Sequence, residues 1–174
     1  MSWGGGRRGT RLTVGRAAPS LSIVPALAGH IPALAPRLRA IDAAECRAMG
    51  RSAAGALRHG LVASARCWTA LIDGQPEAMF GLVVESVVPS VGVPWFLGSD
   101  AVWRHGRALV TIGPQVLATM HDSSALLANL VSADNFRAIR LLRRWGFAIA
   151  PEVITVGGMG FHRFASHRNE QENA

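Results

Sequence analysis

The segment 126–147, LLANLVSADNFRAIRLLRRWGF, restricts the fold of this chain more than any other segment. Its first part is apolar apart from Asn129, which is typical of a buried strand. Ser132, Asp134 and Asn135 follow, and their side-chain oxygens can accept hydrogen bonds from the free N–H groups of a first helical turn. Apolar residues then recur at three- and four-residue spacing as far as Gly146, which suits the left-handed position after a helix. The segment predicts a strand, a tight turn and a helix in succession.

The rest of the chain divides into further strands and helices. Hydrophobic periodicity predicts strands at 21–24, 66–72, 77–88, 93–97 and 125–131, and two more strands within 148–164. It predicts helices at 31–49 and 52–61, and a third helix that begins at Asp100 or Arg104 and ends at Met120. Asp73 and Gly74 form the strongest hairpin signal. This order predicts an α+β fold with a central mixed, mostly antiparallel sheet flanked by about four helices.

We expect one domain over residues 20–164, because 174 residues of which 49% are hydrophobic suffice for one core. Residues 1–19, rich in Gly and Arg, predict a disordered basic tail, and residues 165–174 a polar tail. A secretory signal is the alternative for these basic residues together with the apolar stretch at 21–28, but that stretch is short and contains Pro25. No run approaches the roughly 18 apolar residues of a membrane span, so we expect no membrane partner.

The charge of the chain is compatible with several anionic partners. Its formal net charge is +7, and every basic residue is Arg. A GC-rich genome explains the Arg content, and selection for phosphate or carboxylate binding is the alternative. Nucleic acid, an acidic protein surface and a phosphate-bearing cofactor all remain open. Cys46 and Cys67 are expected to be buried free thiols, and no Cys/His spacing indicates a metal site.

Five residues of the first segment form the pattern N-x-x-A-x-x-L-x-x-x-x-G-F: Asn135, Ala138, Leu141, Gly146 and Phe147. This pattern resembles the fifth strand and fourth helix of the GCN5-related N-acetyltransferase (GNAT) superfamily. The resemblance implies a GNAT-like fold and acyl-coenzyme A bound where the fourth and fifth strands diverge. In that superfamily the residue after the Leu is commonly Tyr, the general acid toward the coenzyme A thiolate. Here it is Leu142, and the chain contains no Tyr.

The resemblance also implies a cofactor-binding turn. The superfamily motif [R/Q]-x-x-G-x-[G/A] matches best at 103–108, WRHGRA, where Trp103 replaces the expected Arg or Gln. Backbone N–H groups at a helix start bind phosphates well, and Arg side chains can add to this. A solvated basic turn is the alternative. For acetyl-CoA, the predicted cofactor-binding residues are Arg104, His105, Gly106, Arg107, Ala108, Asn129 and Asn135.

The sequence does not decide the role of Asn129 or the identity of the catalytic base. Asn129 needs hydrogen-bond partners if it is buried, so it either secures the turn before Asn135 or faces a ligand cleft. The catalytic base is unknown: Glu85 and Asp100 are the only carboxylates in suitable places, and each has a structural alternative as an exposed strand residue or a helix cap. If the protein is an enzyme, we expect an open cleft between the fourth and fifth strands, with free backbone N–H groups near Gly106. If the protein is instead a scaffold without activity, we expect Trp103 or Leu142 to fill this cleft.

A narrower resemblance covers about residues 20–164. The segments DAAEC (42–46) and PWFLGSDAVW (94–103), with Asn129, Asn135 and Gly146, resemble the internal virion protein A (internal core protein) of short-tailed coliphages and its relatives in tailed phages. This implies a bacteriophage or prophage protein with degenerate acetyltransferase motifs, in the virion or the bacterial host cytoplasm. A phage virion or host protein would be its partner, and the Arg-rich tail and helix leave nucleic acid open.

Two functional hypotheses follow. In the first, the protein is a virion-assembly or binding protein that has kept a GNAT-like scaffold. In the second, it is an active, diverged N-acyltransferase that uses acetyl-CoA on an unknown acceptor. Whether the protein is an enzyme is therefore not decided by its sequence.

Overall fold

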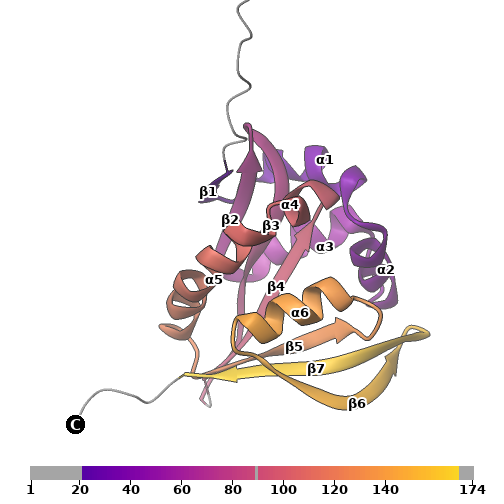
Figure 1. Cartoon of the computed structure of the whole chain (residues 1–174), viewed down its shortest axis with the longest axis vertical. Helices are drawn as coiled ribbons and strands as arrows, with labels where there is room; N and C mark the ends of the chain where they lie inside the picture. The colour runs from indigo at the N-terminus through magenta and orange to yellow at the C-terminus, as the bar shows by residue number, and fades with distance from the viewer. Residues whose placement is uncertain (1–20, 89, 169–174) are drawn as a thin grey trace, which may run out of the picture.

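The computed structural model describes residues 21–88 and 90–168. They form a mixed sheet of seven strands in the order β1-β2-β3-β4-β5-β7-β6. The strands are β1 (Leu21–Pro25), β2 (Ser64–Ile72), β3 (Gln75–Val87), β4 (Ser90–Gly98), β5 (Leu126–Ser132), β6 (Ala148–Val156) and β7 (Met159–His167). All neighbours are antiparallel except β4 and β5 (Figure 1). The predicted α+β class with a mostly antiparallel sheet is confirmed, and the basic tail at 1–19 lies outside the described residues.

The helices are shorter and more numerous than predicted. They are α1 (Ile31–Leu34), α2 (Ala40–Ala48), α3 (Ala53–Ala63), α4 (Asp100–Arg104), α5 (Gly106–His121) and α6 (Phe136–Arg144), with 3₁₀ turns at Ala28–His30 and Ala35–Arg37. The single helix predicted at 31–49 is wrong, because Leu38 is extended and forms a bridge with Ser99 beyond the end of β4. The helix predicted from Asp100 or Arg104 is divided at His105, whose ψ is 33°. The described residues thus form six α-helices instead of about four.

Several local sequence signals are confirmed. Ser52, Ser99 and Asn135 cap α3, α4 and α6, because each side chain accepts a hydrogen bond from an N–H group of the first turn. The hairpin between β2 and β3 turns at Asp73 and Gly74, both of which have positive φ. These signals act over only a few residues, which explains why the sequence alone identifies them.

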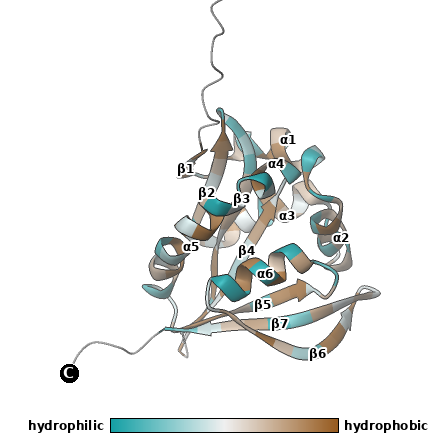
Figure 2. Cartoon of the chain, in the orientation of Figure 1, coloured by the Kyte–Doolittle hydropathy of each residue, from teal (hydrophilic) through white to brown (hydrophobic). Residues whose placement is uncertain are grey.

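Helices cover both faces of the sheet. One face packs against α4, α5 and α6 through residues such as Phe80 and Leu82, and the other packs against α1 and α3 through residues such as Met79 and Trp95. In Figure 2, α6 carries both hydrophobic and strongly hydrophilic residues, as expected of a helix with one buried side. No helix of the described part is long and apolar enough to cross a membrane.

The parallel strands β4 and β5 separate soon after they meet. They pair only at Val91 with Leu126 and at Gly92 with Leu127. Beyond these positions β4 continues beside β3 as far as Gly98, and β5 continues beside β7 as far as Ser132. Figure 1 shows the two strands diverging, with α6 in front of β5. The sheet is therefore open between them.

The contact between α5 and α6 leads to a first prediction. Gly113 is buried in α5, and a Cβ atom there would lie 1.9 Å from Nε1 of Trp145, which donates to the Leu109 carbonyl at 3.2 Å. Gly113→Ala should therefore lower the free energy of unfolding by about 1–3 kcal/mol, although Ala is the better helix former. Urea unfolding measures the effect. Gly106→Ala, in open space, is the control, and equal effects of both substitutions would contradict this packing.

Candidate functional site

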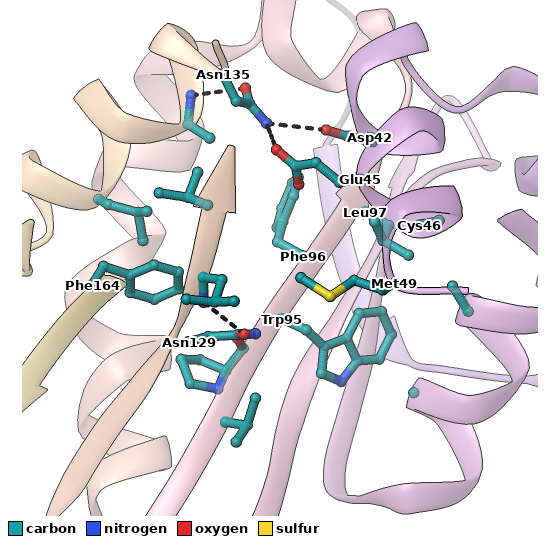
Figure 3. A pocket seen from close by; sticks show the side chains of 18 of the residues that line it. Asp42, Glu45, Cys46, Met49, Trp95, Phe96, Leu97, Asn129, Asn135 and Phe164 are labelled. Carbon is teal, nitrogen blue, oxygen red and sulfur yellow. Dashed lines mark hydrogen bonds between the residues drawn. The ribbon is translucent and has the colours of Figure 1, made fainter. Parts of the chain in front are cut away.

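A cavity of about 380 Å³ lies where β4 and β5 diverge. Residues from α2, α3, β3, β4, β5 and α6 line it, and Figure 3 shows it from close by. It passes through the sheet, because its lining includes Trp95, which packs on the α1 and α3 face, and Phe96, which packs on the α4 and α5 face. A molecule bound here would reach both layers of helices.

The edge of β4 presents backbone groups to this cavity. The Pro94 carbonyl accepts a hydrogen bond from Asn129 Nδ2 at 2.9 Å, and the Gly98 N–H donates to Asp42 Oδ2 at 3.1 Å. Alternate residues of a strand direct their backbone groups to the same edge, so those of Phe96 also point between β4 and β5. Phe96 lies beyond the last residues at which β4 pairs with β5, at Gly92 and Leu127. The cavity is therefore bordered by the part of β4 that does not pair with β5.

The facing edge of β5 is occupied by side chains. Asn129 Oδ1 accepts from the N–H of Leu130 at 2.7 Å, and Glu45 Oε1 accepts from the N–H of Ser132 at 3.1 Å. Asn129 thus uses both ends of its amide, one on each diverging strand. It lines the cavity, as one of the two alternatives expected, and its hydrogen bonds go to Pro94 and Leu130 instead of the turn before Asn135.

A buried polar network closes the wide end. The Arg39 guanidinium, 6% exposed, donates to both oxygens of Asp42, 2% exposed, at 2.5 and 3.2 Å. Asn135 Nδ2 donates to Glu45 Oε1 at 2.9 Å and to Asp42 Oδ1 at 3.4 Å (Figure 3). Because Asn135 also caps α6, the network ties α2 to α6 across the gap between β4 and β5.

Glu45 is the candidate catalytic base in this cavity. Burial, followed by the negative charge of Asp42, raises the pKa of the Glu45 carboxyl, while hydrogen bonds from Asn135 and Ser132 lower it. Burial likewise raises the pKa of Asp42, against the opposing charge of Arg39. The second oxygen of Glu45 has no hydrogen-bond partner among the described residues, and Figure 3 shows the carboxylate between Asn135 and Phe96. A carboxylate with a raised pKa suits general base catalysis near neutral pH.

Sequence reasoning missed Glu45. It considered only Glu85 and Asp100: Glu85 is exposed at the edge of the cavity, and Asp100 is exposed in the first turn of α4, outside the cavity lining. The available signal was the spacing of Arg39, Asp42 and Glu45, which places them on one side of a helix. Such spacing usually indicates a solvated face, so it gave no reason to expect a buried network.

The structure separates the predicted cofactor-binding residues into two groups. Asn129 and Asn135 line the cavity. Arg104, His105, Gly106, Arg107 and Ala108 lie at the junction of α4 and α5 and do not line it. Arg104 and Arg107 are exposed there, and a role of this turn in binding a cofactor stays a prediction.

Trp103 and Leu142 border the cavity without filling it. The Trp103 ring packs edge-on against Phe96, with the Arg39 guanidinium 4.1 Å from the ring centroid. The cleft is therefore open at these two side chains, which the sequence analysis expected of an enzyme. No group of three or more metal-ligating side chains is found among residues 21–88 and 90–168.

The cysteines are not suited to nucleophilic catalysis. Cys46 is buried beside the cavity and Cys67 is half-buried, and neither forms a disulfide. Burial raises the pKa of each thiol to about 11. Since the thiolate is the reactive form, both thiols are expected to be unreactive at neutral pH.

Comparison with known proteins establishes the fold. No protein-family model and no curated protein matches the chain. The aminoglycoside acetyltransferase AAC(6')-Ib, in complex with ribostamycin and coenzyme A, matches with a TM-score of 0.63 at 14% identity, over 89% of this chain and 99% of that chain. A GNAT-family acetyltransferase from Bacillus anthracis matches with a TM-score of 0.62 at 9% identity, over 84% and 94%.

A third match is an acetyltransferase from Salmonella typhimurium that modifies the N-terminal serine of a 50S ribosomal subunit protein. It has a TM-score of 0.59 at 12% identity and covers 86% of this chain and 95% of that chain. The chain therefore has the GNAT fold, as the pattern at residues 135–147 predicted. At these identities the likeness concerns the fold alone.

Proposed function

We propose that this protein is an N-acyltransferase that uses an acyl-coenzyme A such as acetyl-CoA. The observation that carries the proposal is that one cavity holds both the open edge of β4 at Phe96 and the carboxylate of Glu45, whose hydrogen bonds use only Oε1. Structures of AAC(6')-Ib, which shares the fold, contain coenzyme A or acetyl-CoA. The residues present fit such a molecule, because the gap between β4 and β5 is open to both faces of the sheet.

The chain's own groups have distinct roles in this proposal. Acetyl-CoA, when bound, supplies a thioester carbonyl for transfer. The N–H of Phe96 would hold and polarise that carbonyl oxygen, since a fixed backbone donor stabilises the negative charge that develops on it. Glu45 would accept the proton that an attacking amine loses. Asn129 and Asn135 would keep the strands and α6 at the spacing the cavity needs.

The absence of Tyr does not contradict this function. A Tyr hydroxyl at position 142 would protonate the departing thiolate, and Leu142 cannot. A thiol has a pKa of about 8.5, however, so it can leave as the thiolate near neutral pH without a protein acid. The reaction therefore depends more on Glu45 and Phe96 than on an acid.

Filling the cavity tests the proposal. Ala138, on α6, lines the cavity and is half-buried, so Ala138→Trp should occupy the gap beside β5. We expect wild-type protein to bind acetyl-CoA in calorimetry and to melt at a higher temperature in its presence. The variant should stay folded and lose at least about tenfold in affinity, equivalent to about 1.4 kcal/mol. Ala63→Trp, on the exposed end of α3, is the control, and wild type that does not bind acetyl-CoA would refute the function.

The outer turn is tested separately. If the exposed turn at Arg104–Ala108 meets the phosphates of coenzyme A, Arg107→Glu should weaken acetyl-CoA binding about 5- to 30-fold, because it replaces an attractive charge with a repulsive one. Calorimetry at low and high salt measures this effect, which should shrink as salt increases. Arg58→Glu, on the exposed surface of α3, is the matched control. Equal affinities of both variants would place the phosphates elsewhere.

The virion role is the second candidate function. It is supported by the resemblance of residues 42–46 and 94–103 to the internal virion protein A family, whereas none of the three structures named above is described as a phage protein. The virion, host and nucleic-acid partners and the location stay predictions. Co-purification with phage particles would support this role, and binding of acetyl-CoA favours the acyltransferase.

A further inference from the structure

The half of the cavity beside α2 and α3 is lined mainly by apolar side chains of the strands. The strand residues that line it there are Val83, Val93, Trp95, Leu97 and Leu130. Trp95 forms its floor: its Nε1 donates to Ser64 Oγ at 2.8 Å, and a Cβ at Gly60 would lie 2.4 Å from its ring. The floor is therefore rigid, flat and apolar.

The charged side chains in this half lie at its inner end and at its outer edge. Arg39 and Asp42 neutralise each other in the buried pair, so Glu45 is the carboxylate left at the inner end. The outer edge carries Arg51, His59 and Glu85, all of them exposed, so acidic and basic groups are mixed there. A single positive charge is thus favoured deep in the cavity, next to apolar walls. A polycation would meet only one further carboxylate in the lining, that of Glu85, and the lining also includes the Arg51 guanidinium.

We infer that the acceptor is a primary amine carried on an apolar body, such as an arylalkylamine. This inference rests on the proposed function and names its acceptor class. The ammonium group pairs with Glu45, and the apolar body lies over Trp95 and beneath Met49, which Figure 3 shows above that ring. In the transfer, the ammonium first loses one proton through Glu45 to solvent water, and the neutral amine nitrogen then bonds to the acetyl carbon as the carbon–sulfur bond breaks. Glu45 takes the proton that the nitrogen loses, and the bonding electrons leave with sulfur as the thiolate.

This class of amine differs from the aminoglycoside bound in one of the structures that share the fold. AAC(6')-Ib is bound to ribostamycin, an aminoglycoside with several amino groups. Such a polycation needs several carboxylates, because each ammonium loses hydration when it binds. The present cavity instead offers apolar side chains, and burying an apolar body against them favours binding in proportion to the area removed from water.

The test compares three amines with the full-length protein. Tryptamine has one amino group on an apolar body, whereas spermidine and ribostamycin are polycations. Release of free coenzyme A from acetyl-CoA should show a kcat/KM for tryptamine roughly 10- to 100-fold above that for either polycation. Calorimetry without acetyl-CoA should detect tryptamine binding independently of turnover.

A matched pair of variants tests the location. Met49 is 37% exposed at the mouth of the cavity, and Val62 is 86% exposed on α3 outside it. Met49→Lys should raise the dissociation constant of tryptamine about tenfold, because it removes an apolar contact and adds a like charge. Val62→Lys should leave that constant unchanged and should bind acetyl-CoA as wild type does.

The outcomes separate this inference from the proposed function. Acetyl-CoA binding with preferred transfer to spermidine or ribostamycin would overturn the acceptor class and leave the acyltransferase intact. Equal effects of Met49→Lys and Val62→Lys, or no tryptamine binding, would also overturn it. Failure of wild type to bind acetyl-CoA would overturn both.

Discussion

Replacing Glu45 with Gln is expected to lower the rate of acetyl transfer by about 10²- to 10⁴-fold, the range that a positioned general base contributes. Gln keeps the side-chain oxygen that accepts from Ser132 and Asn135, so the fold and the cavity should persist. What the variant loses is the free carboxylate oxygen that faces the cavity. Steady-state kinetics with saturating acetyl-CoA measures the loss, and affinity for acetyl-CoA should change little.

The pH dependence distinguishes a catalytic role from a structural one. Burial and Asp42 raise the pKa of Glu45, so its carboxylate fraction grows as pH increases through that raised value. The wild-type rate should therefore rise with pH across this titration, and the residual rate of Glu45→Gln should lack that rise. Glu85→Gln, at the exposed edge of the cavity, is the control and should keep the wild-type profile. A Glu45→Gln profile identical to that of wild type would show that Glu45 is not the base.

Removing the carboxylate of Asp42 should produce the largest loss of stability. Asp42→Ala leaves the Arg39 guanidinium 6% exposed without its ion-pair partner and leaves the Gly98 N–H without its acceptor. Breaking a buried ion pair from one side costs about 3–5 kcal/mol, because the remaining charge is not resolvated. Urea unfolding of wild type and variant measures the difference in unfolding free energy.

Two further variants make this prediction specific. Glu152→Ala removes an exposed carboxylate from β6 and should change the unfolding free energy by no more than about 0.5 kcal/mol. The double variant Arg39→Met with Asp42→Leu should recover part of the loss, since apolar side chains of similar size replace buried ion pairs well. A loss below about 1 kcal/mol for Asp42→Ala would mean that water reaches the pair.

The local elements were predictable because their signals act within a few residues. The caps at Ser52 and Asn135 and the turn at Asp73–Gly74 each satisfy backbone groups next to them in the chain. Hydrophobic periodicity likewise predicted the strands and the order in which helices separate them. The resemblance at residues 135–147 added the fold, which the comparison with solved structures confirmed.

The candidate site depends on contacts between distant parts of the chain. Leu38 and Ser99 pair across 61 residues, and this contact divides the predicted helix and brings α2 to the end of β4. Glu45 then meets Ser132 and Asn135, and its pKa rises because that meeting buries it. Periodicity describes one element at a time, so it cannot show which faces meet. The sequence by itself thus determined the elements and their order, whereas only the tertiary structure decided that β4 and β5 separate over a cavity with Glu45 inside it.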